Sequence, residues 1–258
     1  MRKILFFICF MVFIQTPVLA KELPTKGRIP HAGGSVNGID HTNSKEAILL
    51  LIENKEKVTE LDFMFTKDHV LVLNHGWTDR QRKAPTWDQF KNQPISDQFT
   101  PISAKEALSL LYHGQTNIQI MVDTQEKDIV AVYKELKRIC DKLDPKYFKQ
   151  VVIPSFYYEK EYKELDKLFH FKYYVFYAYK QTGKKKTKPK VSFDKFERIF
   201  KKCPKTKYIS MWSFYCTKKN LNKVQRYCDN IIAHPVNSIK QQHKLHDLGV
   251  QYYMTDIL

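Results

Sequence analysis

The chain has 258 residues, 43% of them hydrophobic and 14% aromatic, a composition that excludes a disordered protein. With only 8 Gly and 11 Pro, it is neither collagen-like nor rich in linkers. The 43 Lys and Arg against 27 Asp and Glu give a formal net charge of +16, which attracts anionic partners. A length near 250 residues suits one large domain or two small ones.

The first 20 residues are predicted to be a signal peptide, which leaves residues 21–258 as one mature domain. A basic start at Arg2 and Lys3 precedes an apolar run, Ile4–Ile14, and the residues before position 21 fit cleavage after Ala20. The alternative, an uncleaved membrane anchor, needs roughly 17 or more apolar residues, and Gln15 interrupts the run first. Nothing later is long and apolar enough to span a bilayer. We therefore expect an exported protein, periplasmic or secreted, with no transmembrane segment in the mature chain.

Short β-branched or aromatic runs alternate with longer helical patterns along the mature chain. This alternation predicts an α/β protein, a (β/α)8 TIM barrel, with an open doubly wound sheet as the alternative. The predicted strands are Arg28–His31, Val58–Met64, Ile118–Val122, Val151–Pro154, Tyr173–Tyr177, Tyr208–Met211, Ile231–His234 and Gln251–Met254, with a short extra one at Val70–Leu73. The predicted helices are Ser44–Asn54, Ala104–Tyr112, Lys127–Leu143, Glu159–Phe169, Phe193–Lys202, Lys218–Tyr227 and Ser238–Leu248.

Two segments break this alternation. His75–Thr100 is a long polar connection, and long connections in compact domains are usually functional. Gln181–Lys190 contains the run KKKTKPK. This run is interpreted as a solvated, mobile loop or, alternatively, as an electrostatic contact with phosphate-bearing surfaces.

Four cysteines remain after the predicted cleavage: Cys140, Cys203, Cys216 and Cys228. Export permits disulfides, and the predicted helices place Cys203 and Cys228 near the ends of consecutive helices at the bottom of the barrel. If a bridge forms, we expect it to be Cys203–Cys228, with four free thiols as the alternative. The spacing contains no CxxC pair, which argues against a zinc ribbon.

Five polar residues stand at or near the ends of predicted strands: His31, Glu60, Asp62, His75 and Asp123. Glu60 and Asp62 are two residues apart on one strand, so their side chains project from the same face. In a barrel, the carboxyl ends of the strands meet at one mouth, where barrel enzymes keep their active sites. We therefore expect these five side chains to gather there.

The residue types suit phosphoryl chemistry. Three converging carboxylates repel one another unless a hard cation neutralises them, which implies Mg²⁺ or Ca²⁺ bound by Glu60, Asp62 and Asp123. Two imidazoles, His31 and His75, can serve as general base and general acid near neutral pH. Each histidine alone could equally be structural, and the pair Glu60 and Asp62 could be exposed; the hypothesis depends on their joint placement.

The sequence resembles the glycerophosphodiester phosphodiesterases over roughly residues 28–257. The matching segments are His31-Ala-Gly-Gly, Thr42-Asn43-Ser44, Glu60-Leu-Asp62-Phe-Met-Phe-Thr66-Lys67-Asp68, Val72-Leu-Asn-His75, Val236-Asn237, Leu248-Gly249-Val250 and Thr255-Asp256. The residues of the segments His31-Ala-Gly-Gly and Thr42-Asn43-Ser44 look closer to those of an exported bacterial branch related to phosphatidylinositol phospholipase C. The resemblance implies a TIM barrel and a metal-dependent phosphoric diester hydrolase, in which Glu60 and Asp62 bind the metal while His31 and His75 transfer protons.

The chain departs from the family pattern at several positions. Ala32 stands where Arg is common, Thr42 replaces a Glu, Gly76 replaces an Asp, and Gln125 stands where a Lys usually follows the third acid, here Asp123. The first two changes remove groups that face phosphate or glycerol, so the substrate need not be a simple glycerophosphodiester. It could also be a lipid headgroup or a polymer phosphodiester.

Further residues are assigned weaker roles. Asn43, Gln125 and Trp212 are candidates for substrate binding. Trp77, Trp87, Trp212 and Tyr215 could line a sugar or headgroup site or, as the favoured alternative, pack in the core or at the rim. His234 and Asp256 could support the site through hydrogen bonds. The remaining histidines are interpreted as surface or packing residues: His41, His69, His113, His170, His243 and His246.

Two other functions compete with the hydrolase. One is a catalytically inactive barrel that binds anionic lipid or polymer at a surface. The other is nucleic-acid binding, which the positive charge allows but for which the sequence contains no recognition motif. A metal-free mechanism, in which a cationic side chain replaces the ion, is the alternative to Mg²⁺ or Ca²⁺.

Overall fold

The computed structural model describes residues 27–77, 83–114, 116–179 and 193–257. Two sheets form the body, one with the strand order β1-β10-β9-β8-β7-β6 and one with the order β3-β2-β4-β5. The strands are β1 (Gly27–Pro30), β2 (Val58–Phe65), β3 (Leu71–Leu73), β4 (Gln119–Asp123), β5 (Val152–Ile153), β6 (Ser155–Phe156), β7 (Tyr174–Tyr177), β8 (Thr206–Trp212), β9 (Ile231–His234) and β10 (Tyr252–Thr255).

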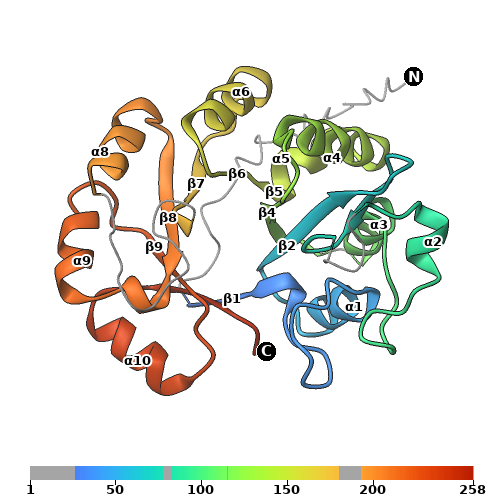
Figure 1. The fold of residues 1–258 in the computed structure, drawn as a ribbon, viewed down its shortest axis with the longest axis horizontal. Coiled ribbons are helices and arrows are strands. Elements are labelled where there is room, and N and C mark those ends of the chain that lie inside the picture. The colour runs from blue at the N-terminus through green and yellow to red at the C-terminus, as the bar shows by residue number, and fades with distance from the viewer. Residues whose placement is uncertain (1–26, 78–82, 115, 180–192, 258) are drawn as a thin grey trace, which may run out of the picture.

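The helices lie around these strands, as Figure 1 shows. Those of the N-terminal half are α1 (Lys45–Glu53), α2 (Trp87–Lys91), α3 (Ala104–His113), α4 (Ile129–Leu143) and α5 (Tyr147–Val151). Those of the C-terminal half are α6 (Glu159–Phe169), α8 (Phe193–Lys202), α9 (Lys218–Val224) and α10 (Ile239–Asp247). Short 3-10 turns follow β1 and β8, at His31–Gly33 and Ser213–Tyr215.

The two sheets are parts of one barrel. All neighbouring strands pair in parallel except β3, which pairs antiparallel to β2. β5 lies within the predicted strand Val151–Pro154, and β6 begins just beyond its end; the two flank Pro154, which has no N–H for a strand ladder. At the other junction, the Thr59 hydroxyl on β2 donates to the carbonyl of Pro30 on β1 at 3.0 Å. The predicted (β/α)8 barrel is confirmed.

Side chains alternate along the strands between the interior of the barrel and its helical coat. The inner cluster includes Ile29, Val58, Met121, Val175 and Ile232, whereas residues such as Leu61 and Val122 pack in the larger outer core. The helices cover this outer face because each has an apolar stripe; on α4 the buried positions include Val132, Tyr133 and Leu136. The barrel therefore has two apolar layers, separated by the strands themselves.

The predicted helices and strands match the observed ones to within a few residues, and two α-helices of the described residues were not predicted. α2 lies inside the segment predicted as a polar connection, and it begins with a capping box between Thr86 and Gln89. α5 was not predicted either. Both helices have five residues, too few for a hydrophobic periodicity to show in the sequence.

Three expectations concern residues away from the barrel mouth. Cys140, Cys203, Cys216 and Cys228 are all buried free thiols, so the alternative to a Cys203–Cys228 bridge holds in this structure. The predicted signal peptide and the KKKTKPK run lie outside the described residues. Among the helices that are described, none is long and apolar enough to cross a membrane.

Candidate active site

The strand register brings the candidate residues to one mouth of the barrel. Glu60 lies two residues after the inner core residue Val58, so it and Asp62 point into the barrel toward its carboxyl end. By the same alternation Asp123 follows Met121, and the pairing of β2 with β4 sets Asp62 directly beside it. Gln119, which has the same parity, pairs with Val58 at the opposite end of the strand.

The three carboxylates form a compact group. One oxygen from each of Glu60, Asp62 and Asp123 lies within 4.8 Å of the other two. The Ala32 N–H donates to Glu60 Oε2 at 2.9 Å, and the Tyr157 hydroxyl lies 2.7 and 2.9 Å from the two oxygens of Asp123. Glu60 Oε1 is buried without a hydrogen-bond partner. Neighbouring residues thus hold the group in place but leave an acceptor oxygen unused.

The pKa values of these three carboxyl groups show that their negative charges repel one another, which is the pattern that a bound cation would relieve. Burial and the charges of Asp62 and Asp123 raise the pKa of Glu60 well above its usual range. Burial and the charge of Asp62 also raise the pKa of Asp123 to about 7. Only Asp62 has a lowered pKa, because the hydrogen bond and charge of His75 outweigh its burial. An oxygen-only donor set with this mutual repulsion fits a hard divalent ion such as Mg²⁺ or Ca²⁺.

His31 is held beside these carboxylates by a second acid. Its ring Nδ1 lies 2.7 Å from Asp256 Oδ1, and its Nε2 lies 3.7 Å from Glu60 Oε2. The turn after β1 packs closely on α1: Gly33 has φ +82°, and an added Cβ would lie 2.9 Å from the Cβ of Ala47. Burial opposes ionisation of Asp256, but hydrogen bonds from His31 and Asn237 lower its pKa to about 2.

His75 approaches from the other side, on the segment that follows β3. Its Nδ1 lies 3.0 Å from Asp62 Oδ1, and 63% of its side chain is exposed to solvent. A carboxylate only accepts hydrogen bonds, so both His31 and His75 carry their proton on Nδ1 when neutral. In each ring the second nitrogen, Nε2, then has a lone pair to offer.

The weaker candidates divide into two sets. Gln125 and Trp212 line the cavity at this mouth, whereas the Asn43 amide donates to Asp62 Oδ2 at 2.9 Å and positions that carboxylate. Trp77 and Trp87 pack against Phe90. Tyr215 is buried against Phe214. These last three pack, as one of the two interpretations predicted.

The cavity has a volume of about 790 Å³ and a largely aromatic far wall. Tyr177 and Tyr179 stack at 5.5 Å between ring centroids, and Tyr179 lies 4.9 Å from Trp212. His234 completes this wall, and burial followed by the nearby His31 lowers its pKa well below the usual range. Tyr177 ends β7, which has the pattern of an ordinary buried strand, and Tyr179 follows two residues later, so no pattern in the sequence marked either tyrosine.

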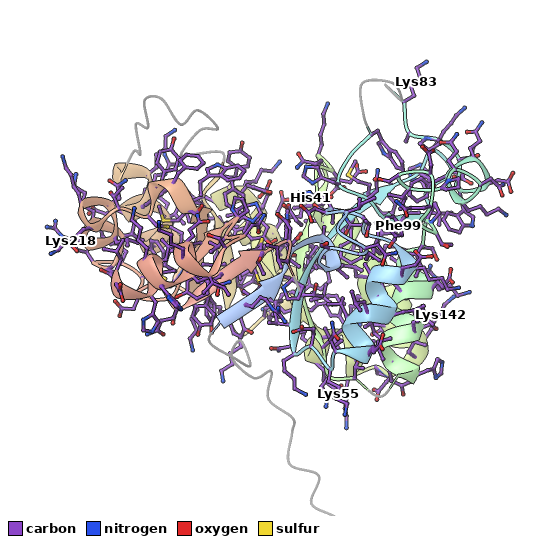
Figure 2. The ribbon with its side chains drawn as sticks, turned by 90° about the horizontal axis from the view of Figure 1, so that it is seen from below. His41, Lys55, Lys83, Phe99, Lys142 and Lys218 are labelled. Carbon is purple, nitrogen blue, oxygen red and sulfur yellow. The ribbon has the colours of Figure 1, made fainter. Side chains whose placement is uncertain are left out.

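His41 is an exposed residue, as predicted, but it also lies beside His31 and Asp256, which the sequence did not indicate. Its Nε2 lies 3.2 Å from Asp256 Oδ1, and its ring stands edge-on to that of His31 at 4.5 Å. Figure 2 shows it where the N-terminal and C-terminal halves of the barrel meet. Its loop is short and polar, and no periodicity indicates where such a loop folds.

The fold and the mouth residues define a TIM barrel with an acidic and imidazole-rich site. The solved structures that this chain resembles include glycerophosphodiester phosphodiesterases, as the sequence resemblance predicted. One from Parabacteroides distasonis aligns with a TM-score of 0.63 and 14% identity over 90% of this chain and 92% of that one. One from Thermotoga maritima gives 0.61 and 16% over 89% and 93%.

A phosphodiesterase from Oleispira antarctica, solved with the product sn-glycerol-3-phosphate, gives a TM-score of 0.67 and 13% identity over 90% and 93% of the two chains. No protein-family model matches the chain, and neither does any curated protein. At these identities the comparison shows the shared fold, so the activity has to be argued from the site.

Proposed function

We propose that this chain is a metal-dependent phosphoric diester hydrolase. The observation that carries the proposal is the joint placement of three converging carboxylates and two carboxylate-bound imidazoles around one cavity. The structural neighbours are named as enzymes of this class, and one of them holds a glycerol phosphate product. Glu60, Asp62 and Asp123 would hold Mg²⁺ or Ca²⁺, which supplies a positive charge that stabilises a phosphoryl oxygen.

In this proposal His31 and His75 divide the proton transfers. A water or a substrate hydroxyl attacks phosphorus, and one imidazole Nε2 accepts its proton. The other imidazole, protonated, gives a proton to the leaving alcohol. Asp256 and Asp62 orient the rings through Nδ1 and stabilise the imidazolium that forms. Each imidazole–carboxylate pair is held in place by residues at or just after strand ends, so the side chains need little rearrangement during the reaction.

The metal-free alternative has little support at this mouth. It needs a cationic side chain beside the phosphate. The described residues lining the cavity include neither Lys nor Arg. Gln125 occupies the mouth where the family commonly has Lys, and Ala32 is a buried residue where it commonly has Arg. Because neither a Lys nor an Arg side chain stands at these two positions, a bound metal ion would be the main positive charge near the phosphate.

The substrate is a phosphodiester whose second alcohol rests on the aromatic wall. Tyr179 and Trp212 are partly exposed aromatic rings in this wall, and the buried Tyr177 stacks on Tyr179. Such rings suit the carbon skeleton of a headgroup or a ring. The basic charge would bring the enzyme to an anionic lipid surface or polymer. We also propose export after cleavage at Ala20, which N-terminal sequencing of the mature protein tests directly.

The decisive assay is turnover of a panel of phosphodiesters with Mg²⁺ or Ca²⁺, followed by phosphorus NMR, which also reveals any cyclic product. His31→Ala and His75→Ala should each lose about 10²- to 10⁴-fold in rate. His113→Ala, at the exposed end of α3, is the matched control and should keep the wild-type rate. Wild-type rates in both active-site variants would refute the assignment. No turnover of any diester, with metal-independent binding to anionic vesicles, would favour the inactive barrel.

A further inference from the structure

A second cluster of ligand-type atoms lies beside the three carboxylates. One atom each from His31, His41 and Asp256 lies within 4.8 Å of the other two. His31 Nδ1 and His41 Nε2 both approach the same oxygen, Asp256 Oδ1, at 2.7 and 3.2 Å. Unlike the oxygen-only group of Glu60, Asp62 and Asp123, this cluster offers two nitrogens and one oxygen.

The donor set selects a different kind of ion. Hard cations prefer oxygen ligands, whereas two imidazoles and a carboxylate suit Zn²⁺ and related transition metals. Three protein ligands with an open fourth position are a common arrangement for zinc. The open side here faces the cavity, since all three residues line it.

The surroundings of the cluster fit a bound ion. The Asn237 side-chain N–H donates to Asp256 Oδ2, and the Asn237 Oδ1 accepts from the Asp256 backbone N–H. Asn237 thus orients the carboxylate, and outer hydrogen bonds of this kind strengthen metal sites. His234 is buried, its Nδ1 has no hydrogen-bond partner, and its ring centroid lies 4.3 Å from that of His31. A neutral imidazole at this place offers a further nitrogen.

We propose that His31, His41 and Asp256 form a transition-metal site, and that Zn²⁺ bound there inhibits the hydrolase. The inhibition, though not the binding, rests on the proposed function. To bind through Nδ1, neutral His31 must carry its proton on Nε2 instead. The ring then has no free lone pair toward the phosphate, so its acid and base role is lost. His41 acts only as a metal ligand in this scheme.

The test is a calorimetric titration of the whole protein, saturated with Mg²⁺, with ZnCl₂. Wild type should show a tight zinc site, and His41→Asn should weaken it by about 100-fold or more, beyond the losses usual for outer-shell changes. Asn tolerates the left-handed backbone of His41, φ +59°, so this variant removes the imidazole without adding strain. His113→Asn is the control and should bind like wild type.

Cysteines should not compete in this titration, because burial raises the pKa of each of the four thiols to about 12. The inhibition is then measured as the ratio of rates with and without zinc for each variant, and it should fall in His41→Asn. Equal zinc affinity in wild type and His41→Asn overturns the site. Inhibition that excess Mg²⁺ relieves equally in both would place zinc at the carboxylates and also overturn it. Tight zinc binding with no diester turnover would instead count against the proposed function alone.

Discussion

The two walls of the cavity differ in charge and in how they are held. On the β2 and β4 side, Glu60, Asp62 and Asp123 concentrate negative charge, which neighbouring N–H and O–H groups only partly relieve. On the β7 to β9 side, Tyr177 and Trp212 are neutral. Under the proposed function the first wall binds a cation, whereas the aromatic rings of the second wall carry no charge that needs one. We propose that a diester bound between them is oriented by this difference, with its phosphate toward the acids and an alcohol toward the aromatics.

The largest effect is expected on the acidic wall at Asp62, which belongs to the carboxylate group and also holds His75. Asp62→Asn should lower the rate of diester hydrolysis by about 10²- to 10⁴-fold, because it weakens ion binding and releases an acid or base. Asp88→Asn, an exposed change on α2, is the control. Steady-state rates at saturating metal measure this loss. A loss below tenfold would show that Asp62 is not essential for hydrolysis.

The acidic wall should also govern metal affinity. Asp123→Asn should weaken Mg²⁺ or Ca²⁺ binding by about 10- to 100-fold, judged from losses at supporting residues. Wild-type protein at 100 times its Kd should gain about 2.7 kcal/mol in unfolding free energy from the ion, and the variant should gain less at the same concentration. Thermal unfolding with and without metal measures this. An unchanged gain in Asp123→Asn, with Asp141→Asn on α4 as control, would exclude Asp123 as a ligand.

Changes in the aromatic wall should lower kcat/KM for the substrate without changing the affinity for the metal ion. Trp212→Ala removes a ring face worth roughly 1–1.5 kcal/mol, so kcat/KM should fall by about tenfold. Metal affinity should stay the same, because Trp212 is outside the carboxylate group. Trp87→Ala, on α2 and not among the residues that line the cavity, controls for the loss of a tryptophan. A parallel loss of metal affinity in Trp212→Ala would mean that the two walls are not separate.

The smallest effect is expected on the unfolding free energy, in a comparison of two tyrosines of β7. The hydroxyl of Tyr177 is buried without a partner, whereas that of Tyr174 lies 3.2 Å from Asp166 Oδ1. Tyr177→Phe should leave the unfolding free energy unchanged or raise it by up to about 1 kcal/mol, and Tyr174→Phe should lower it by about 1 kcal/mol. Urea unfolding of both variants measures the difference. Equal losses would show that Tyr177 has a partner in solution.

The two walls also differ in how far the sequence predicted them. The carboxylates follow strand alternation and strand ends, and both are local patterns, so Glu60, Asp62 and Asp123 could be placed in advance. The partners of His31 could not be placed as firmly, because Asp256 is 225 residues away and only barrel closure brings it near. Tyr177 reads as a core residue until the register shows that it lies at the mouth. His41 depends on the path of an irregular loop, for which propensities give no guide.

The barrel itself was predictable because alternating strands and helices leave few topologies open. The break at Pro154 follows from its missing N–H, whereas the five-residue helices α2 and α5 depend on local capping and burial. The state of the four cysteines, by contrast, could not be predicted from the sequence. Their helices were predicted well enough to choose a pair, yet whether thiols bridge depends on packing that helix boundaries do not describe.

The central claim, that the acidic wall works by holding a hard cation, is tested most directly by chelation. Purified protein is treated exhaustively with EDTA, and turnover of a phosphodiester that it hydrolyses is followed by phosphorus NMR before and after addition of Mg²⁺ or Ca²⁺. We expect EDTA to abolish turnover and one of the two ions to restore it, because buried carboxylates without an ion repel both each other and the phosphate. Undiminished turnover after complete chelation would contradict the account.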